Sequence, residues 1–394
     1  MADAIVIGGG PSGGAAAIAL AAQGREVVLI EKAAFPRRKV CGEFLSATSL
    51  PVLADLGIGA DWAAQAGPEV RRLALFAGRR TVEAPMPGGQ GYGRALGRDV
   101  LDEMLLDRAR ALGVQVLQPE RAERIAREGT MGVVTTASGA ALRAPLIVAA
   151  HGSWERGGLP SHLPKQHAPG DLMGFKAHFH AARLAPDLMP LLAFRGGFGG
   201  MVWADAGRMS VSCCIRRDVL AEVRRPGEAA GETLERHLIA ECRGVAEVLE
   251  GAQRIGPWLA AGPIRPGLRP GFEEGIFRVG NLAGEAHPVV AEGIAMAVQS
   301  GWMLARALEG AALEDPAALA AAGAAYERAW RRQFAGRIRA AALFSALTMH
   351  PSISAPLAGV VARAPWVLTQ GARLSGKTRA IRPPRSGRVA GESF

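Results

Sequence analysis

Two short apolar runs near the N-terminus flank a segment made almost entirely of small residues. The runs, residues 3–7 (DAIVI) and 26–30 (EVVLI), are rich in β-branched side chains. Continuous apolar runs of this length are typical of strands in a parallel sheet that is covered on both faces. Residues 13–23, between them, are nearly all Ala, Gly, Ile and Leu, which favours a helix lying close to the strands. The pattern predicts a β-α-β unit at the start of the chain.

Further along, periodic and alternating segments predict helices and strands in turn. Residues 98–112 carry apolar side chains at helical spacing, which indicates a helix with one buried face. Residues 130–149 alternate, turn and end in the run LIVAA, which predicts a hairpin followed by a strand. Residues 172–216 indicate several antiparallel strands, and residues 228–250 predict a helix.

The strand-turn-helix pattern returns late in the chain. Residues 275–279 predict a short strand, which is followed by a Gly-rich turn and a helix over 293–309. Because these elements come after a β-rich stretch, we expect the first domain to be interrupted by a second one and then resumed.

The turn after the first predicted strand has the spacing Gly8-x-Gly10-x-x-Gly13, and Glu31 ends the second strand. Gly8 allows the tight turn, Gly10 lets the backbone approach a pyrophosphate, and Gly13 lets the helix pack on the strand. Glu31 can accept a hydrogen bond from a ribose hydroxyl, and an acid there disfavours NADP. The alternative is a glycine-rich turn with an ordinary surface Glu31. The fingerprint predicts dinucleotide binding without choosing between NAD and FAD.

Two further segments favour a flavin. They are PRRKVCGEFLS at residues 36–46 and GNLAGEAHPVVAEGIAMAV at residues 280–298. With them, the chain resembles FAD-dependent oxidoreductases of the para-hydroxybenzoate hydroxylase fold. It looks most like the branch that holds geranylgeranyl reductases and their monooxygenase and halogenase relatives. The resemblance covers roughly residues 1–310 and is carried by four separated motifs.

The resemblance implies FAD-binding positions in each motif. The glycine-rich turn and the acid after the second strand would hold the ADP half, and basic residues would lie beside the flavin cleft. An arginine at a helix start would reach the phosphates or the ribityl chain, and the last turn and helix would lie beside the isoalloxazine ring. These positions are Gly8, Gly10, Pro11, Ser12, Gly13, Glu31, Lys32, Arg38, Lys39, Arg98, Gly280, Asn281, Pro288, Gly293 and Ile294.

Elementary electrostatics supports the last of these positions. A helix starting at Gly293 would offer backbone N–H groups to the edge of the flavin that gains negative charge on reduction. The alternative is that residues 280–293 form only a loop before a buried helix.

Two residues depart from the family pattern. Asn281 stands where the family has an acid that bonds a ribityl hydroxyl, and it carries no charge. His151-Gly152 stands where many hydroxylases have an Asp-Gly pair linked to FAD and NADPH handling. NADPH as the direct electron donor is therefore in doubt. His151 is either a pocket residue or a structural histidine.

Pattern and resemblance together predict an α/β fold. A Rossmann-like FAD domain of the GR2 type would be interrupted by an antiparallel β-sheet substrate domain, with a C-terminal helical segment. The expected ranges are 1–68, 94–155 and 270–322 for the FAD domain, 69–93 and 156–269 for the substrate domain, 323–371 for the helical segment, and 372–394 for a disordered basic tail.

Three residues are candidates for the chemistry. Cys41 lies where similar reductases place a cysteine facing the flavin, and a buried inert thiol is the alternative. Glu43 could act as an acid or base, although an exposed Glu at a helix start is the simpler interpretation. His287, beside Pro288, could deliver a proton near the ring, or it could only cap the turn.

The β-rich segment is expected to roof the substrate pocket. Its aromatic residues fit an apolar or aromatic substrate better than a sugar or an acid, although some must belong to the domain core; they are Phe175, Phe179, Phe194, Phe198 and Trp203. The halogenase motif Trp-x-Trp-x-Ile-Pro is absent, which disfavours halogenation. A second GxGxxG in a strand-helix context is also absent, so NAD(P)H would bind only transiently as a reductant.

Cysteine usage and hydropathy indicate a reduced, soluble setting. Four cysteines do not form a disulfide framework, and their spacing predicts no metal site. We expect no signal peptide and no membrane span, and a cytoplasmic location.

The formal charge of +10 is concentrated at one end of the chain. Residues 328–394 hold 12 Lys/Arg and one acid, so the first 327 residues hold 34 basic and 35 acidic side chains. Residues 323–346 predict a basic amphipathic helix, with Trp330, Phe334, Ile338 and Leu343 near one face. It either contacts the inner face of an anionic membrane or covers the FAD domain. Nucleic acid is disfavoured as a partner because no recognition motif is present.

These features predict an FAD-dependent oxidoreductase, first a monooxygenase-type enzyme acting on an apolar aromatic, polyketide or isoprenoid metabolite. The first alternative is a geranylgeranyl reductase-like C=C reductase or dehydrogenase of a lipid. A distant alternative is a non-catalytic flavin-binding protein, suggested only by Asn281 and His151. Truncation near Gly371 is expected to leave flavin binding intact.

Overall fold

A computed structural model describes residues 2–89, 91–153, 158–159, 166–348, 359–377 and 381. Its framework is a six-stranded sheet in the order β18-β19-β11-β1-β2-β7. The strands are β1 (Ala4–Ile7), β2 (Val27–Ile30), β7 (Gln115–Leu117), β11 (Leu146–Ala149), β18 (Phe272–Glu273) and β19 (Ile276–Arg278). All neighbours pair in parallel except β18 and β19. The predicted β-α-β unit is confirmed.

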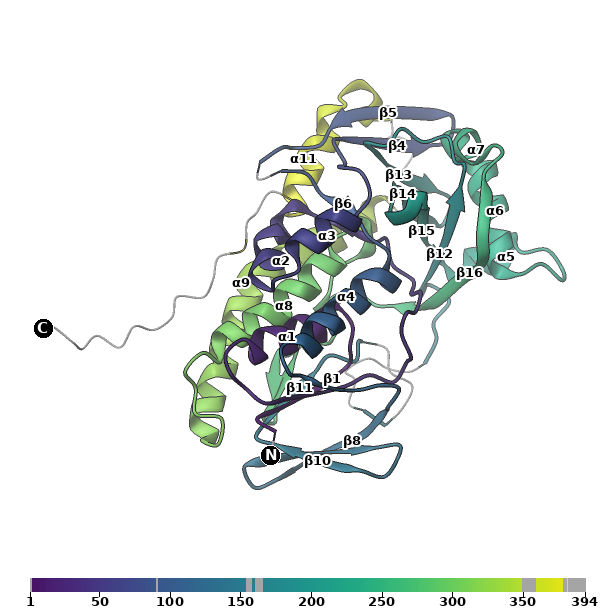
Figure 1. Cartoon of the computed structure of the whole chain (residues 1–394). Helices are drawn as coiled ribbons and strands as arrows, with labels where there is room; N and C mark the ends of the chain where they lie inside the picture. Colours follow the sequence, from purple (N-terminus) through teal and green to yellow (C-terminus); the bar gives the residue numbers. More distant parts are fainter. Residues whose placement is uncertain are drawn as a thin grey trace, which may run out of the picture.

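Helices cover one face of this sheet and a small sheet covers the other (Figure 1). The helices are α1 (Pro11–Ala21), α4 (Arg98–Ala111), α8 (Gly293–Ala307) and α9 (Pro316–Thr348), and the small sheet comprises β8 (Ala122–Glu128), β9 (Met131–Thr136) and β10 (Ala141–Ala144). Along β1, Ala4 and Val6 pack in the helical core, and Ile5 and Ile7 pack in the core under the small sheet. Alternate side chains of one strand thus serve two cores, which explains its continuous apolar run.

A second, seven-stranded sheet has the order β16-β12-β15-β14-β13-β4-β5. Its strands are β4 (Arg72–Ala77), β5 (Arg80–Pro85), β12 (Leu172–His180), β13 (Leu188–Phe194), β14 (Gly197–Trp203), β15 (Met209–Arg216) and β16 (Gln253–Ile264). The expectation of an antiparallel sheet holds for every pair but one, because β13 and β4 run parallel. The hairpin β4–β5 comes from an earlier part of the chain and adds to the edge strand β13.

Two helices stand where the sequence predicted one helix over 228–250. α6 (Ala230–Glu241) and α7 (Arg243–Leu249) meet at Cys242, which has an extended backbone. The Cys242 thiol donates towards Phe76 O and Ala193 O, and the Arg243 N–H donates to Gly78 O. The chain leaves the helical path there because it is bonded to β4, to β13 and to the turn after β4. Shorter helices are α2 (Leu50–Asp55), α3 (Gly59–Gln65) and α5 (Arg217–Val223), and the short strand pairs are β3 (Phe44–Leu45) with β6 (Arg94–Ala95) and β17 (Gly267–Leu268) with β20 (Gly284–Glu285).

The C-terminal region differs from expectation in several ways. α9 begins at Pro316, earlier than predicted. Leu343, expected on one face with Trp330, Phe334 and Ile338, is 64% exposed, whereas those three side chains are buried. Arg337 of the same helix is buried although it is basic. α11 (Trp366–Leu374) runs past residue 371, so the start of the expected tail is helical. Residues 378–380 and 382–394 of that tail lie outside the described residues.

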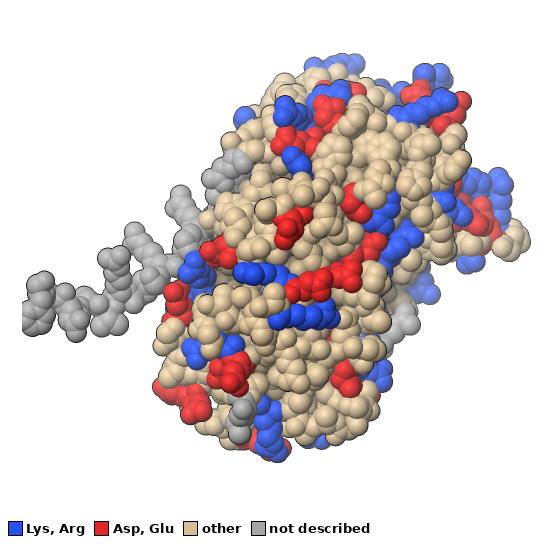
Figure 2. Space-filling view, in the orientation of Figure 1, with Lys and Arg blue, Asp and Glu red and all other residues tan. Residues whose placement is uncertain are grey.

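Charges of both signs are interspersed on the face of the molecule shown in Figure 2. None of the helices in the described ranges is long and apolar enough to cross a membrane.

Candidate functional site

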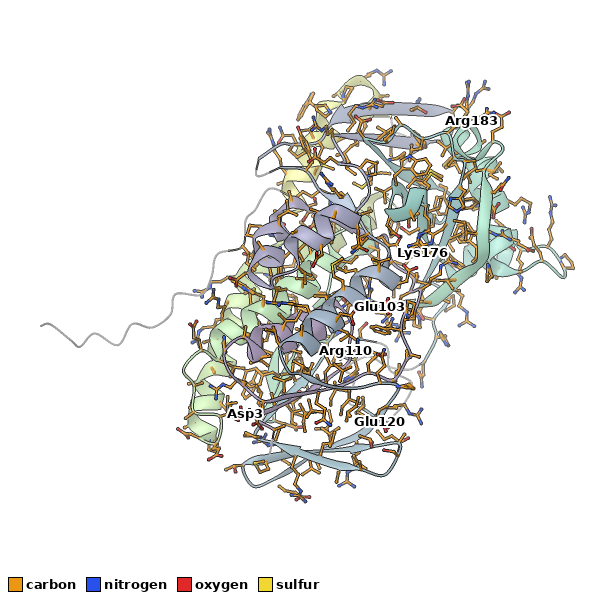
Figure 3. The ribbon with its side chains drawn as sticks, viewed as in Figure 1. Asp3, Glu103, Arg110, Glu120, Lys176 and Arg183 are labelled. Carbon is orange, nitrogen blue, oxygen red and sulfur yellow. The ribbon has the colours of Figure 1, made fainter. Side chains whose placement is uncertain are left out.

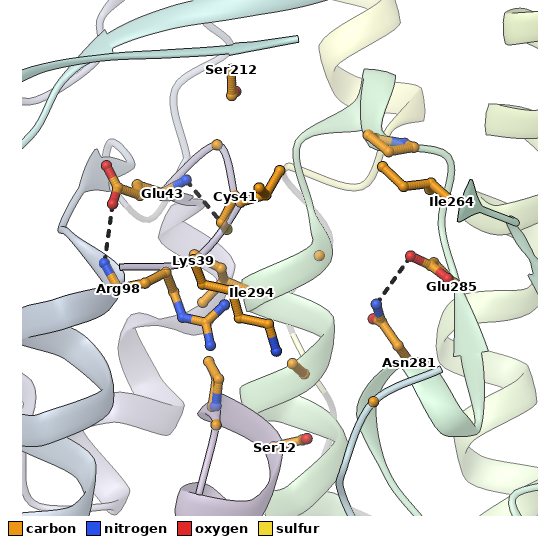
Figure 4. A pocket seen from close by; sticks show the side chains of 18 of the residues that line it. Ser12, Lys39, Cys41, Glu43, Arg98, Ser212, Ile264, Asn281, Glu285 and Ile294 are labelled. Carbon is orange, nitrogen blue, oxygen red and sulfur yellow. Dashed lines mark hydrogen bonds between the residues drawn. The ribbon is translucent and has the colours of Figure 1, made fainter. Parts of the chain in front are cut away.

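A cavity of about 560 Å³ runs from the glycine-rich turn after β1 to the seven-stranded sheet (Figure 4). Four groups of residues contribute to its lining: the turn and the end of β2, the segment leading to Phe44, the turn before α8, and strands of the seven-stranded sheet. Segments far apart in sequence therefore meet around one space. Of the fifteen expected FAD-binding positions, Gly8, Gly10, Pro11, Ser12, Glu31, Lys32, Lys39, Arg98, Asn281, Pro288, Gly293 and Ile294 line this cavity. Gly13, Arg38 and Gly280 do not appear in its lining.

The glycine-rich turn requires glycine at particular positions. Gly8 has a φ of +111°, and a Cβ there would lie 2.6 Å from Ala150 O. A Cβ on Gly13 would overlap the carbonyl oxygen of Gly8. Gly10 has only the Arg98 guanidinium near its Cβ position, at 3.5 Å, and it opens onto the cavity. Gly13 thus serves helix packing, and Gly10 leaves the backbone accessible to a ligand.

Glu31 is buried at the end of β2 and its carboxylate is held by backbone donors. The Gly9 N–H donates to Oε2 at 2.7 Å, and the Ala33 N–H donates to Oε1 at 2.9 Å. Arg37 lies 3.6 Å from the same carboxylate. These contacts fix the orientation of the carboxylate at the cavity wall, where it keeps lone pairs for a ribose hydroxyl.

Basic side chains converge opposite the glycine-rich turn. Arg98 makes a bidentate ion pair with Asp102 at 2.6 and 2.7 Å, and Arg37 lies 3.7 Å from Asp102. Burial, together with the positive charges of Arg98 and Arg37, lowers the pKa of Lys39 to about 8. Positive side chains gathered at one wall of a cavity favour a polyanionic ligand such as a pyrophosphate.

The structure places Arg38 differently from the expectation. Its guanidinium donates to Ile255 O at 3.1 Å and contacts His178 Nδ1 at 3.1 Å, on the seven-stranded sheet. Arg37, its neighbour, lines the cavity instead. Successive side chains of an extended segment point in opposite directions, so the run PRRK can send one arginine to each side.

The turn before α8 forms the other end of the cavity. Gly280 has a φ of +62° and its Cβ position lies 2.6 Å from Ser12 Oγ, so it serves the close approach of this turn to α1. The Asn281 amide donates to Glu285 Oε1 at 3.1 Å, and Ser153 Oγ donates to Glu285 Oε2 at 2.9 Å. Burial raises the pKa of Glu285. Sequence reasoning noted the missing acid at Asn281 but missed this carboxyl four residues later.

His287 is buried in this cavity without a hydrogen-bond partner for either ring nitrogen among the described residues. Its ring lies 4.8 Å from that of Phe198, centroid to centroid. Burial lowers the pKa of His287 to about 4, so the ring is neutral at pH 7. It does not cap the turn by a side-chain hydrogen bond. Two unsatisfied buried nitrogens facing a cavity are typical of a ligand site.

Glu43 is buried between the two halves of the molecule, so the expectation of an exposed glutamate is wrong. Its carboxylate pairs with Lys176 and His178 of β12, the latter at 2.8 Å. Figure 3 shows where Lys176 lies in the molecule. The carboxylate also accepts from the Arg98 N–H at 3.1 Å (Figure 4). Arg38 can only donate to His178 Nδ1, so the neutral tautomer donates from Nε2 to Glu43. Burial alone would raise the pKa of Glu43, but His178 and Lys176 lower it to about 2.

Sequence reasoning missed Lys176 and His178, although a signal was present. Both lie in the otherwise apolar run LMGFKAHFH, two residues apart, and therefore on one face of a strand. A lysine and a histidine side by side on a buried strand face need a buried acid nearby.

Cys41 lines the cavity beside Arg98, and its Sγ accepts from the Glu43 N–H at 3.5 Å. Burial alone would lower the pKa of Arg98. Asp102 and the Cys41 side chain outweigh this effect and raise the pKa of Arg98 above its ordinary value. The thiol is therefore placed next to a buried cation.

The seven-stranded sheet closes the cavity with apolar side chains. Of the aromatic residues expected there, Phe175 and Phe198 line it, and Phe179, Phe194 and Trp203 belong to the core beneath α6 and α7. The remaining apolar lining on this side is Met189, Leu191, Met201, Val202 and Ile264. Ser212 contributes a hydroxyl from the same sheet.

The residues present fit FAD. One end of the cavity has open backbone, a fixed carboxylate and positively charged side chains, which suits an adenosine diphosphate group. The other end has the N-terminus of the 15-residue helix α8, where no side chain caps the first N–H groups, and the unpartnered ring of His287. That end suits a polar heterocycle with hydrogen-bonding edges. No group of three or more His, Cys, Asp or Glu in the described part of the chain is arranged to hold a metal.

Comparisons with known proteins agree with this fit. The FAD binding domain family matches residues 1–319. Menaquinone reductase of Mycobacterium tuberculosis is 33% identical over 154 residues, which is 39% of this chain and only 38% of the mycobacterial protein. Digeranylgeranylglycerophospholipid reductase 2 of Methanopyrus kandleri is 28% identical over 84% of this chain and 83% of its own length.

Solved structures share the fold. The flavin-dependent brominase Bmp2 superposes with a TM-score of 0.78 at 17% identity, covering 97% of this chain and 94% of its own. PqsL, a probable FAD-dependent monooxygenase of Pseudomonas aeruginosa, superposes with a TM-score of 0.69 at 20% identity, covering 88% and 95%. The predicted α/β architecture is therefore confirmed.

The buried Glu43 cluster yields a stability prediction. Glu43→Gln leaves Lys176 buried without its counter-ion, so we expect the free energy of unfolding to fall by roughly 3–5 kcal/mol. Denaturant unfolding at pH 7 measures this. Glu250→Gln, which removes the exposed partner of Arg183, is the matched control and should cost about 0–1 kcal/mol.

The effect should depend on pH with a defined sign. The folded pKa of Glu43, about 2, lies below the ordinary value of 4.5, so its stabilisation is complete above pH 4.5 and is lost as pH falls towards 2. The difference between wild type and Glu43→Gln should shrink over that range. Adding Lys176→Met should recover part of the loss. Equal stability of Glu43→Gln and wild type at pH 7 would contradict the proposed role of the cluster.

Proposed function

The chain belongs to the FAD binding domain family, and we propose from this that it is a monooxygenase-type FAD-dependent oxidoreductase of an apolar metabolite. The substrate class is an aromatic, polyketide or isoprenoid compound. The observation that carries the proposal is the continuity of the cavity, which joins a nucleotide-binding turn to an apolar sheet surface. A cofactor and an apolar substrate can meet in that space.

Different residues of the cavity would bind different parts of the cofactor. Glu31 would accept from the adenosine ribose, and Gly10 with Arg98 would contact the pyrophosphate. Asn281, oriented by Glu285, would donate to a ribityl hydroxyl. The N–H groups of Gly293 and Ile294 would meet the pyrimidine edge of the ring. When bound, the flavin supplies the redox chemistry.

The protein supplies the surroundings for the reaction. Phe175, Phe198 and Met201 exclude water from the sheet side of the cavity. The positive charge of Lys176 is neutralised by Glu43, so this side offers an uncharged surface. His287, neutral and unpartnered, can accept a proton or a hydrogen bond from the substrate or the cofactor.

A second candidate function is reduction of a C=C bond in a lipid. Cys41 favours it, because a thiol beside a buried arginine could donate a proton to the reduced carbon. The mycobacterial and archaeal relatives carry the names of reductases, which supports this candidate. Neither candidate requires a resident nicotinamide site, and NAD(P)H would act as a transient reductant. Halogenation is not proposed, since the chain lacks Trp-x-Trp-x-Ile-Pro.

The C-terminal helices supply a surface for a membrane. Four of the five large apolar side chains that are exposed in the described residues lie there: Leu343, Val360, Trp366 and Leu374. Exposed arginines accompany them at positions 339, 363 and 373. Apolar and basic groups together favour an anionic lipid surface, from which an apolar substrate could enter.

The reaction class can be tested on purified protein. We expect an absorbance band near about 450 nm from bound FAD, and its loss on anaerobic addition of NADH, NADPH or dithionite. Reoxidation by O2 should release peroxide without substrate and an oxygenated product with an aromatic or polyketide substrate. Anaerobic saturation of a prenyl alkene would instead establish the reductase function. A protein that binds no FAD would overturn both candidates, and one that binds FAD without turnover would be a flavin-binding protein.

His287 gives a prediction that needs no known substrate. In the apoprotein we expect one histidine NMR signal, absent from His287→Gln, to titrate near pH 4. Its folded pKa lies below the ordinary 6.5, so the unfolded chain takes up this proton first and stability falls as pH drops from 6.5 to 4. His287→Gln should remove that part of the pH dependence, retain FAD, and slow turnover about 10²–10⁴-fold if the ring moves a proton. A titration near pH 6.5 would show that the ring is solvated.

Membrane contact is checked by sedimentation with vesicles. The wild-type protein should pellet with vesicles containing anionic phospholipid and much less with neutral ones, and about 0.5 M salt should weaken binding. Trp366→Ser with Leu374→Ser should reduce binding. Ile239→Ser, at the exposed apolar residue of α6, is the control and should leave it unchanged. Equal binding to neutral and anionic vesicles would argue against the basic surface.

A further inference from the structure

A buried carboxylate sits immediately before the helix that faces the flavin end of the cavity. Glu292 precedes Gly293, the first residue of α8, and is 1% exposed. Its Oε2 accepts from Ser46 Oγ at 3.0 Å, and its Oε1 accepts from Lys377 Nζ at 3.0 Å. Arg337 Nη1 of α9 lies 4.0 Å away. The carboxylate is thus turned towards the C-terminal part of the chain.

Lys377 binds the turn as well as the carboxylate. Its ammonium donates to Val290 O at 2.6 Å, and it lies 5.2 Å from the centroid of the Phe44 ring. Its side chain is 8% exposed. Val290 ends a short turn that continues into Ala291, which has a φ of +51°. The lysine therefore holds a left-handed, non-glycine turn in place at two points.

The direction of Glu292 matters for the N-terminus of α8. An acid at this position would ordinarily accept hydrogen bonds from the first N–H groups of the helix. Here it makes no such bond, and the residues Ala291, Gly293 and Ile294 line the cavity. Its contacts are instead with Lys377, Ser46 and Arg337. The first N–H groups of α8 stay available for a ligand.

Lys377 is itself held by the seven-stranded sheet. It follows α11, in which Ala372 packs in a core with Phe44, Val70 and Met86. Thr369 Oγ1 of the same helix donates to Pro85 O at the end of β5. Residues 366–377 therefore connect β5, at the edge of the seven-stranded sheet, to the turn before α8.

We propose that Lys377 is a positioning residue for the cofactor: it draws the Glu292 carboxylate away from the N-terminus of α8 and leaves those N–H groups free for the flavin. The proposal rests on the proposed function, since it concerns the same cavity. It gives the segment beyond residue 319, where the match to the family ends, a role in cofactor binding. It also revises the expectation that truncation near Gly371 leaves flavin binding intact.

The test compares single substitutions at Lys377. Lys377→Met removes the cation while keeping much of the apolar stem, so we expect Glu292 to turn towards the helix and compete with the flavin. The dissociation constant for FAD, measured by fluorescence titration of the apoprotein, should rise roughly tenfold or more. The midpoint potential of the bound flavin should fall, because a carboxylate approaches the edge that gains negative charge. A chain ending at Ser375 should behave in the same way.

Two further variants separate positioning from general stability. Lys377→Arg keeps the charge and should restore FAD affinity and potential to near the wild-type values. Arg373→Met, an exposed basic residue one turn earlier whose side chain contacts Gln370, is the matched control and should change neither. The double variant Lys377→Met with Glu292→Gln lacks the competing charge, so its flavin potential should return most of the way to the wild-type value. If Lys377→Met alone unfolds, the double variant should also regain most of the folded state.

The outcomes are distinguishable from those of the proposed function. A wild-type protein without FAD affinity would overturn the flavoenzyme assignment itself. Wild-type FAD affinity and potential in a folded Lys377→Met would overturn only the role of Lys377. A loss in Lys377→Met that Glu292→Gln does not relieve would also overturn it, because the lysine would then act independently of the carboxylate.

Discussion

A carboxylate buried between the two sheets holds the molecule together around its cavity. Glu43 meets Lys176 and His178 from the seven-stranded sheet and the N-terminus of α4 from the parallel-sheet side. None of these charges could be buried alone, because desolvation of an unpaired ion costs several kcal/mol. The two halves must therefore dock in one register. That register brings the apolar roof over the glycine-rich turn, so this ion cluster sets the geometry in which the reaction would occur.

Other charged side chains around the cavity are also paired or hydrogen-bonded. Arg98 is paired with Asp102, Glu285 is bonded by Asn281, and Glu292 is paired with Lys377. Each of these three groups has a partner among the described residues, and His287, which has none there, is neutral. The flavin end of the cavity thus presents fixed dipoles and oriented side chains to a ligand, whereas the positive side chains of Arg37, Lys39 and Arg98 gather near the glycine-rich turn. This arrangement suits a cofactor that changes its own charge during the reaction.

Sequence reasoning predicted what depends on local rules. The β-α-β unit follows from periodicity and from glycines whose positions tolerate no Cβ, and twelve of the fifteen expected cofactor positions line the cavity. It failed where a side chain's neighbour comes from a distant segment. Glu43 was expected at the surface because its partners lie more than 130 residues away. The predicted helix over 228–250 breaks at Cys242 because the thiol bonds to strands that no local pattern reveals.

The charged C-terminal region is another case in which contacts with distant segments were not predicted from the sequence. Composition separates residues 328–394, with their 12 basic side chains, from a body of nearly balanced charge, and this suggests an appendage. Two of those side chains, Arg337 and Lys377, are buried against one carboxylate at the start of α8. Others, such as Arg363 and Arg373, are exposed beside apolar groups. One basic segment thus has two physical roles, because a buried cation acts on its nearest carboxylate and an exposed one acts on whatever surface approaches it. A region that looks peripheral by composition is thus in contact with the turn before α8, whose residues line the cavity.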